Sequence, residues 1–162
     1  MGAKNEAREL REATRELFRN LSLLDRDRAS CCGVTVAQCH AIVEIGRLGK
    51  VSPGMLAETL RLDRSTVTRL ADSLVAMDFI TREQDPEDRR SLVLALTEKG
   101  EQFHSLTEQA MEDFYRSIIQ KMPPEERRAL ITGISAISES YRTGECKCFR
   151  NEDKPAYSGE GE

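Results

Sequence analysis

The sequence contains no tryptophan, and aromatic residues make up only 5% of it. It has no run of about 18 apolar residues, the length that a membrane-spanning helix needs, and residues 1–17 lack the apolar core of a signal peptide. We therefore expect a cytoplasmic protein with no membrane partner. The 162 residues, of which 39% are hydrophobic and 32% charged, fit one domain of helices with exposed charged faces.

The residue patterns of common enzymes are missing too. The sequence has no Cys-x-x-Cys motif, no glycine-rich phosphate loop, and no evident nucleophile with a base and an orienting acid. We therefore expect no catalysis and no required cofactor. The five cysteines are an odd number and unevenly spaced, which does not fit a secreted disulfide framework. They should be reduced thiols unless they bind a metal or react.

Three stretches have the apolar spacing of amphipathic helices. Apolar residues recur every three or four positions in residues 6–28, and similar stripes run through residues 98–121 and about 123–141. Stripes this narrow need partner helices to cover them.

A turn and a second helix are predicted after the first stripe. Gly33 can adopt the left-handed conformation that ends a helix. Thr35 and Gln38 have the spacing of a capping box, so a helix should begin there and run through Leu48.

The next segment predicts a helix-turn-helix followed by a hairpin. Ser52 can cap a helix over residues 53–60, and Asp63 can cap a helix over residues 64–77 after a tight connection. In known proteins the second helix of such a pair reads DNA. Residues 79–97 alternate around a turn and are rich in branched residues, which predicts the two strands of a wing.

One long stretch carries a family resemblance. "LDRSTVTRLADSLVAMDFITREQDPEDRRSLVLALTEKG", residues 62–100, resembles the recognition helix, wing and following helix of the MarR family of bacterial and archaeal transcriptional regulators. The resemblance covers about residues 10–142 in element order. The cysteine-bearing turn and the last residues depart from the common pattern.

The expected fold class is mainly α, an α+β winged helix-turn-helix core with long N- and C-terminal dimerisation helices. The expected parts are dimerisation helices over about residues 6–30 and 98–142, a winged helix-turn-helix over about 35–97, a single domain over 1–142, and a mobile Cys-x-Cys tail over 143–162. The resemblance implies a homodimeric repressor that binds a pseudo-palindromic operator in double-stranded DNA. A two-fold dimer places two recognition helices about one DNA turn apart.

Candidate DNA contacts follow from these elements, although the net charge of the chain is −4, because binding depends on where positive charge gathers. Arginine can donate two hydrogen bonds to guanine, short hydroxyls reach bases or phosphates, and arginines at a hairpin tip can enter a minor groove. In the family pattern an aspartate and an arginine two places later, here Asp88 and Arg90, form a salt bridge that orients the arginine. The candidates are Ser52, Pro53, Arg64, Ser65, Thr66, Thr68, Arg69, Asp88, Arg89 and Arg90.

Two alternatives compete with that interpretation. Asp63, Ser65 and Thr66 can serve only as helix caps while the charged residues are merely solvated. A winged helix that binds proteins instead of DNA would have an apolar or acidic recognition helix, and "DRSTVTR" is neither.

Members of the family respond to a small ligand, an oxidant or a metal, and this chain offers thiols. Soft thiolates bind thiophilic metals or metalloids and react with electrophiles, and zinc-sensing members of the family use ligands from these regions. An adjacent cysteine pair does not easily give two ligands to one tetrahedral ion without strain, although it can serve a larger or trigonal centre or supply one ligand each to two chains. The candidate effector or metal residues are Cys31, Cys32, Cys39, His40, His104, Cys146 and Cys148.

Plain structural roles stay open for several of these residues. Cys39 stands at a hydrophobic staple position and can be a small buried hydrophobe. His40 can pair with Glu44 one turn on, and His104 can be a surface residue, although it can also approach the cysteine turn. A small aromatic ligand in the cleft between the dimerisation helices and the winged helix is the alternative effector.

Overall fold

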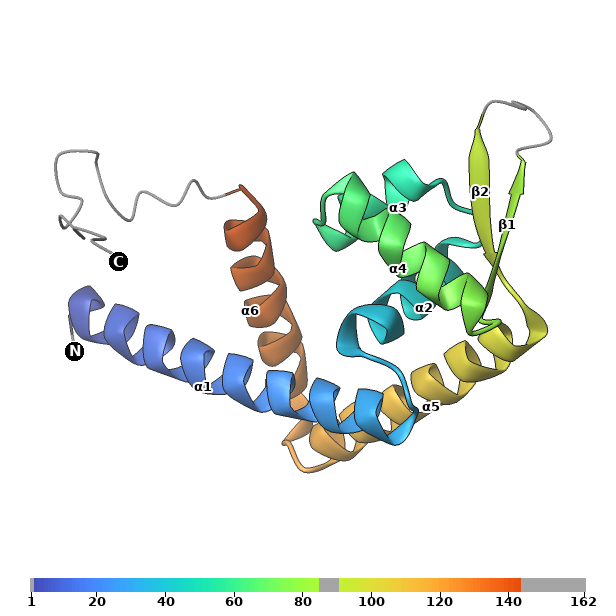
Figure 1. Ribbon diagram of the computed structural model, residues 1–162. Helices are drawn as coiled ribbons and strands as arrows, with labels where there is room; N and C mark the ends of the chain where they lie inside the picture. Colours follow the sequence, from blue (N-terminus) through green and yellow to red (C-terminus); the bar gives the residue numbers. More distant parts are fainter. Residues whose placement is uncertain (1, 85–90, 144–162) are drawn as a thin grey trace, which may run out of the picture. The chain divides into compact units, whose positions relative to one another are not determined.

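The computed structural model describes residues 2–84 and 91–143, with the backbone only for Arg28, Ser30 and Cys31. The chain divides into two compact units, Met1–Asp113 and Phe114–Glu162. Figure 1 shows the elements, which follow one another along the chain as α1 (Ala3–Cys31), α2 (Val36–Leu48), α3 (Pro53–Leu60), α4 (Arg64–Ala76), β1 (Ile80–Gln84), β2 (Leu92–Leu96), α5 (Glu98–Gln120) and α6 (Pro124–Thr143).

This element order confirms the predicted winged helix-turn-helix fold class. The helix bounds lie close to those expected, except that α1 is longer at both ends than residues 6–28. The hairpin turn and the predicted tail lie outside the described residues, apart from Thr143, which ends α6. The single domain over residues 1–142 stays a prediction. None of the described helices is both long enough and apolar enough to cross a membrane.

Side-chain caps set the starts of the helices in the first unit. At α2, the backbone N–H of Gln38 donates to Thr35 Oγ1 at 3.2 Å, and Gln38 Oε1 accepts from the backbone N–H of Thr35 at 2.7 Å. This reciprocal pair is the predicted capping box, which satisfies two backbone donors that the first turn of a helix leaves free. Ser52 caps α3 by accepting from the N–H of Met55 at 3.1 Å.

The turn of the helix-turn-helix is closed by a left-handed residue. Arg61 ends α3 with φ 54° and ψ 42°, a conformation that non-glycine residues adopt rarely. The N–H of Leu62 then donates to the carbonyl of Ala57 at 3.0 Å, so the last turn of α3 is closed by the bonds of a helix C-cap. The tight connection brings α4 directly onto the end of α3.

The core of the first unit lies inside the winged helix. Its fully buried side chains come from α2, α3, α4 and the wing, and include Ile42, Ile45, Leu56, Val67, Leu74, Ile80 and Leu94. β1 and β2 pair antiparallel, with Ile80 opposite Leu96, and Val51 bridges to Leu94 on the other edge of β2. The wing is therefore held to the segment that leads into α3.

A glycine allows α5 to start against Phe79, the residue that precedes β1. A Cβ built at Gly100 would collide with the backbone carbonyl of Phe79, so this position requires a residue without a side chain. Thr97 caps the same turn, since its Oγ1 accepts from the N–H of Gly100 at 3.1 Å.

The second unit contains α6, where the guanidinium of Arg127 donates to the carbonyl of Met122 at 3.1 and 3.2 Å.

Candidate nucleic-acid interface

α4 has one buried and one polar face. Val67, Leu70, Ala71 and Leu74 are buried. Their spacing along a helix of 3.6 residues per turn leaves the first two turns of the opposite face to polar side chains. The exposed residues there are Arg64, Ser65, Thr66, Thr68 and Arg69.

Asp63 organises the start of this face. Its Oδ1 accepts from Ser65 Oγ at 2.5 Å and from the N–H of Thr66 at 2.9 Å, and its Oδ2 accepts from Thr66 Oγ1 at 2.6 Å. The Ser65 hydroxyl, followed by that of Thr66, holds the pKa of the Asp63 carboxyl far below its usual value. Ser65 and Thr66 thus serve as part of the cap, and the lone pairs of their hydroxyls stay able to accept bonds from outside.

Both arginines of α4 are open to solvent. Arg64 and Arg69 are exposed, and neither makes an ion pair with another described residue within 4.0 Å. Thr68 is tied to its own helix, because its Oγ1 donates to the carbonyl of Arg64 at 2.9 Å. The face therefore presents two guanidinium groups on a capped, rigid helix, which is the donor set that binds guanine edges and phosphates.

The wing adds an arginine that the sequence interpretation missed. Arg82 on β1 forms an ion pair with Asp72 on α4, at 2.8 Å. No sequence spacing signals this pair, because it depends on how the strand lies beside the helix. Asp88, Arg89 and Arg90, predicted at the hairpin tip, lie outside the described residues. Ser52 and Pro53 lie at the start of α3 and are half-buried, and Ser52 caps that helix.

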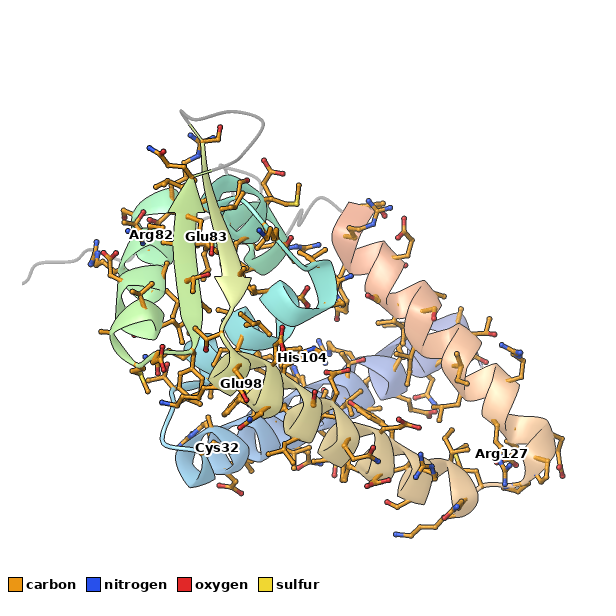
Figure 2. All side chains as sticks on the ribbon, turned by 90° about the vertical axis from the view of Figure 1, so that its right-hand side faces the viewer. Cys32, Arg82, Glu83, Glu98, His104 and Arg127 are labelled. Carbon is orange, nitrogen blue, oxygen red and sulfur yellow. The ribbon has the colours of Figure 1, made fainter. Side chains whose placement is uncertain are left out.

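The cysteine turn lines a separate site in the same unit. A cavity of about 300 Å³, here called the cysteine cavity, is lined by Asp27, Cys32, Cys39, Phe103, Leu106, Thr107 and Ala110. Cys32 is exposed and Cys39 half-buried, and most of the other wall residues are apolar. Figure 2 shows Cys32 at the end of α1, far from Arg82 on the wing.

The two histidines do not join Cys32 and Cys39 in this cavity. His40 Nε2 lies 3.5 Å from Asp25 Oδ2, and Glu44 pairs instead with Arg47 at 2.7 Å, so the structure does not show the His40–Glu44 pair that the sequence left open. His104 lines a second cavity of about 550 Å³ at the base of the wing, where its ring lies against Gly46 and fills the space a Cβ would need.

The other candidate effector residues are only partly covered. The side chain of Cys31, and Cys146 and Cys148 as a whole, lie outside the described residues. Within residues 2–84 and 91–143, no three His, Cys, Asp or Glu side chains are grouped so that they could hold a metal ion.

In sequence, the chain is similar to transcriptional regulators of the helix-turn-helix type. The sequence model of the MarR family matches residues 34–92. The chain is 30% identical over 108 residues to the HTH-type transcriptional regulator YfiV of Bacillus subtilis, which covers 66% of this chain and 67% of YfiV. It is 24% identical over 102 residues to the regulator YdgJ of the same organism, where the match covers 63% of this chain and 62% of YdgJ, less than two thirds of that relative's length.

Solved structures share the fold. Streptococcus pneumoniae FabT in complex with DNA superposes with a TM-score of 0.79 at 23% identity, covering 84% of this chain and 97% of that one. The S. aureus MepR–DNA complex superposes with a TM-score of 0.66 at 16% identity, covering 80% of this chain and 96% of that one.

Proposed function

The chain belongs to the MarR family of transcriptional regulators, and on this premise we propose that it is a homodimeric, sequence-specific repressor acting on DNA in the cytoplasm. Each α4 would enter the major groove of one half of a pseudo-palindromic operator, and the wing would contact the adjacent backbone or minor groove. The observation that carries the proposal is the pair of exposed guanidinium groups of Arg64 and Arg69 on the capped polar face of α4.

The hydroxyl groups of Ser65 and Thr66 already donate to the helix cap, which limits the bonds that they can make to DNA. Since Ser65 and Thr66 donate to Asp63, they would meet DNA as hydrogen-bond acceptors. Arg64 and Arg69 would then supply the donors to guanine or phosphate. Ser52, whose hydroxyl proton is not used by its cap bond, can still donate to a phosphate at the start of α3.

Uncovered apolar side chains support a homodimer. In the single chain, Leu10, Leu17 and Phe18 on α1 keep 52%, 47% and 70% of their surface exposed. On α6, Ile131, Ile134 and Tyr141 are equally open, at 49%, 50% and 68%. Exposed apolar surface of this kind marks interaction sites, and a second copy presents matching surface around a two-fold axis.

The cysteine cavity supports an effector site. Its walls combine apolar side chains with the thiols of Cys32 and Cys39, so its occupant would be a compact apolar molecule or a thiol-reactive one that joins to Cys32. A thiophilic metal or metalloid ion bound by the thiols of Cys31 and Cys32 would be an effector of the same thiol-dependent class. A small aromatic ligand that fills the cavity without reacting is the second candidate, favoured by the cavity volume of about 300 Å³.

Operator retardation tests the DNA-binding part. R64A and R69A should each weaken operator binding by roughly tenfold to a hundredfold, the size of one lost bidentate contact. R128A, which removes an exposed arginine from α6, is the matched control and should leave operator affinity unchanged. Operator affinity that survives both α4 substitutions would disprove reading by α4.

A second experiment separates the two effector classes. Native and denaturing mass spectrometry of the purified protein would detect a bound metal or covalent adduct. Operator release would then be compared between the native chain and a variant with all five cysteines changed to serine. If release persists without thiols, the thiol-reactive effector is wrong and the non-covalent aromatic ligand takes its place.

A further inference from the structure

The C-terminal end of α4 is held by a polar contact from α2. Gln38 Nε2 donates to Ser73 Oγ at 2.5 Å and approaches Met77 Sδ at 3.5 Å. These bonds are partly buried and join residues 35 and 39 positions apart. Because the other end of the same amide accepts from the N–H of Thr35, one side chain connects the first turn of α2 to α4.

The first turn of α5 holds the same end of α4 from another side. Lys99 Nζ donates to the carbonyl of Met77 at 2.7 Å, and Thr97 Oγ1 donates to the carbonyl of Asp78 at 2.6 Å. The Lys99 ammonium also lies 4.4 Å from the centre of the Phe79 ring. A cation on the free carbonyls at a helix C-terminus is favoured both as a hydrogen bond and by the helix dipole.

The two helices that hold α4 also form walls of the cysteine cavity. Cys39 on α2 lines the cavity and directly follows Gln38. Phe103 on α5 lines the cavity one turn after Lys99, and its ring packs edge-on against Phe79, with centroids 5.2 Å apart. A displacement of either wall therefore acts on a residue that touches the end of α4.

We propose that Gln38 and Lys99 are positioning residues for DNA reading, which clamp the C-terminal end of α4 to the two walls of the cysteine cavity. Through this clamp, a molecule in the cavity that shifts α2 or α5 changes the orientation in which α4 meets the operator. The proposal rests on the proposed function, because the orientation of α4 matters only if α4 reads DNA. The size of the response is set by the difference in the molecule's affinity for the two arrangements.

The identity of residue 38 fits this role. A glutamate would close the capping box equally well, since the box needs only an acceptor for the Thr35 N–H. It would lack the N–H donors that reach Ser73 and Met77. The glutamine amide thus supplies a second function beyond the helix cap, and Ser73 is the place to remove that function without touching the cap.

Paired variants test the clamp. S73A and K99M each remove one hydrogen bond to α4 and should lower operator affinity about fivefold, while S73T and K99R keep the hydroxyl or the cation and should restore it. R64A serves as the reference for DNA reading. If R64A weakens binding and S73A and K99M do not, the clamp is wrong and the proposed function stands. If neither R64A nor R69A has an effect, α4 does not read DNA and the proposed function is wrong.

A defined probe tests the link to the cavity. In a parent chain with Cys31, Cys146 and Cys148 changed to serine, N-ethylmaleimide can react only at Cys32 and Cys39. The thiolate adds to the C=C bond of the maleimide, so that a C–S bond forms as the π bond breaks and the adjacent carbon takes a proton from water. Further change of Cys32 and Cys39 to serine supplies the unreactive control.

The expected result is a difference between intact and broken clamps. Alkylation should lower the operator affinity of the parent chain about tenfold, within the usual range of coupling between sites. When the parent chain also carries S73A or K99M, alkylation should lower its operator affinity less than about threefold. Equal losses with and without the clamp would overturn the proposal, as would a parent whose operator affinity is unchanged by alkylation. Circular dichroism of each variant separates these outcomes from unfolding.

Discussion

Arg82, the middle residue of β1, and Asp72 on α4 form an ion pair, with 2.8 Å between Nη2 and Oδ1. Their side chains keep 30% and 58% of their surface exposed, so solvent screens the pair and its contribution to stability is small. Its effect is geometric, because it joins the wing strand to the helix that carries Arg64 and Arg69.

The first prediction concerns this pair. R82M should change the free energy of unfolding by less than about 1 kcal/mol and lower operator affinity about threefold. D72N should lower operator affinity to a similar degree. The double variant should lose no more than either single variant, because all three remove the same interaction. Losses that add in the double variant would show that the two residues act independently, and operator titration with urea unfolding measures both quantities.

The second prediction concerns pH. The hydrogen bonds from Ser65 and Thr66 lower the pKa of the Asp63 carboxyl in the folded chain. A lowered folded-state pKa means that the stabilisation is complete above the unfolded-state pKa of about 3.9 and is lost as pH falls through the folded-state pKa. D63N keeps a capping oxygen without the charge. Its melting temperature should therefore lie below that of the native chain at pH 7, and the gap should narrow steadily below pH of about 4. A gap that stays constant down to pH of about 2 would contradict this account.

The third prediction compares two glycines. G100A would drive a methyl group into the backbone carbonyl of Phe79, whereas the three atoms nearest to a methyl group at Gly46 all belong to the ring of His104. A backbone carbonyl inside a packed unit cannot move aside, but an imidazole can rotate. G100A should therefore cost about 2–3 kcal/mol of stability and G46A less than about 1 kcal/mol, since alanine also gains helix propensity. Equal losses in chemical denaturation would be inconsistent with the close approach of α5 to Phe79.

The fourth prediction tests the homodimer. F18E places a charge on the exposed apolar stripe of α1 and should produce monomers, with operator affinity reduced about a hundredfold or more because the two half-sites are no longer read together. R19E, a charge change at an exposed position on the opposite side of the same helix from Leu10 and Leu17, is the control. Light scattering after gel filtration measures the oligomeric state. A dimeric F18E chain would remove α1 from the interface.

The sequence predicted local structure well because local structure depends on neighbouring residues. The capping box of Thr35 and Gln38 and the caps at Ser52 and Asp63 follow from a spacing of three residues, and each is present. The sequence offered Glu44 as a possible partner of His40, because spacing along one helix is all that a local pattern shows. Glu44 is one turn away in sequence, but Asp25 on α1 lies nearer to the imidazole, and its position depends on how α1 meets α2.

Contacts between distant segments could not be predicted from one sequence. Arg82 reaches Asp72, Gln38 reaches Ser73, and Lys99 reaches Met77 across 10, 35 and 22 positions. Nothing in the spacing of these residues selects one partner over another. Each pair exists because buried residues such as Val67, Ile80 and Leu94 fix the distance and angle between the elements that carry it.

The sequence by itself determined that this chain forms a winged helix-turn-helix with long flanking helices, since caps, turns and apolar periodicity are encoded within a few residues of one another. Only the tertiary structure decided that Cys32 and Cys39 line one cavity and that His104 lines another. It also decided that Gln38 on α2 and Lys99 on α5 donate hydrogen bonds to the end of α4. Those relationships come from packing. The burial of apolar side chains brings α1, α2, α4 and α5 together, and the polar contacts form where that packing leaves them within reach.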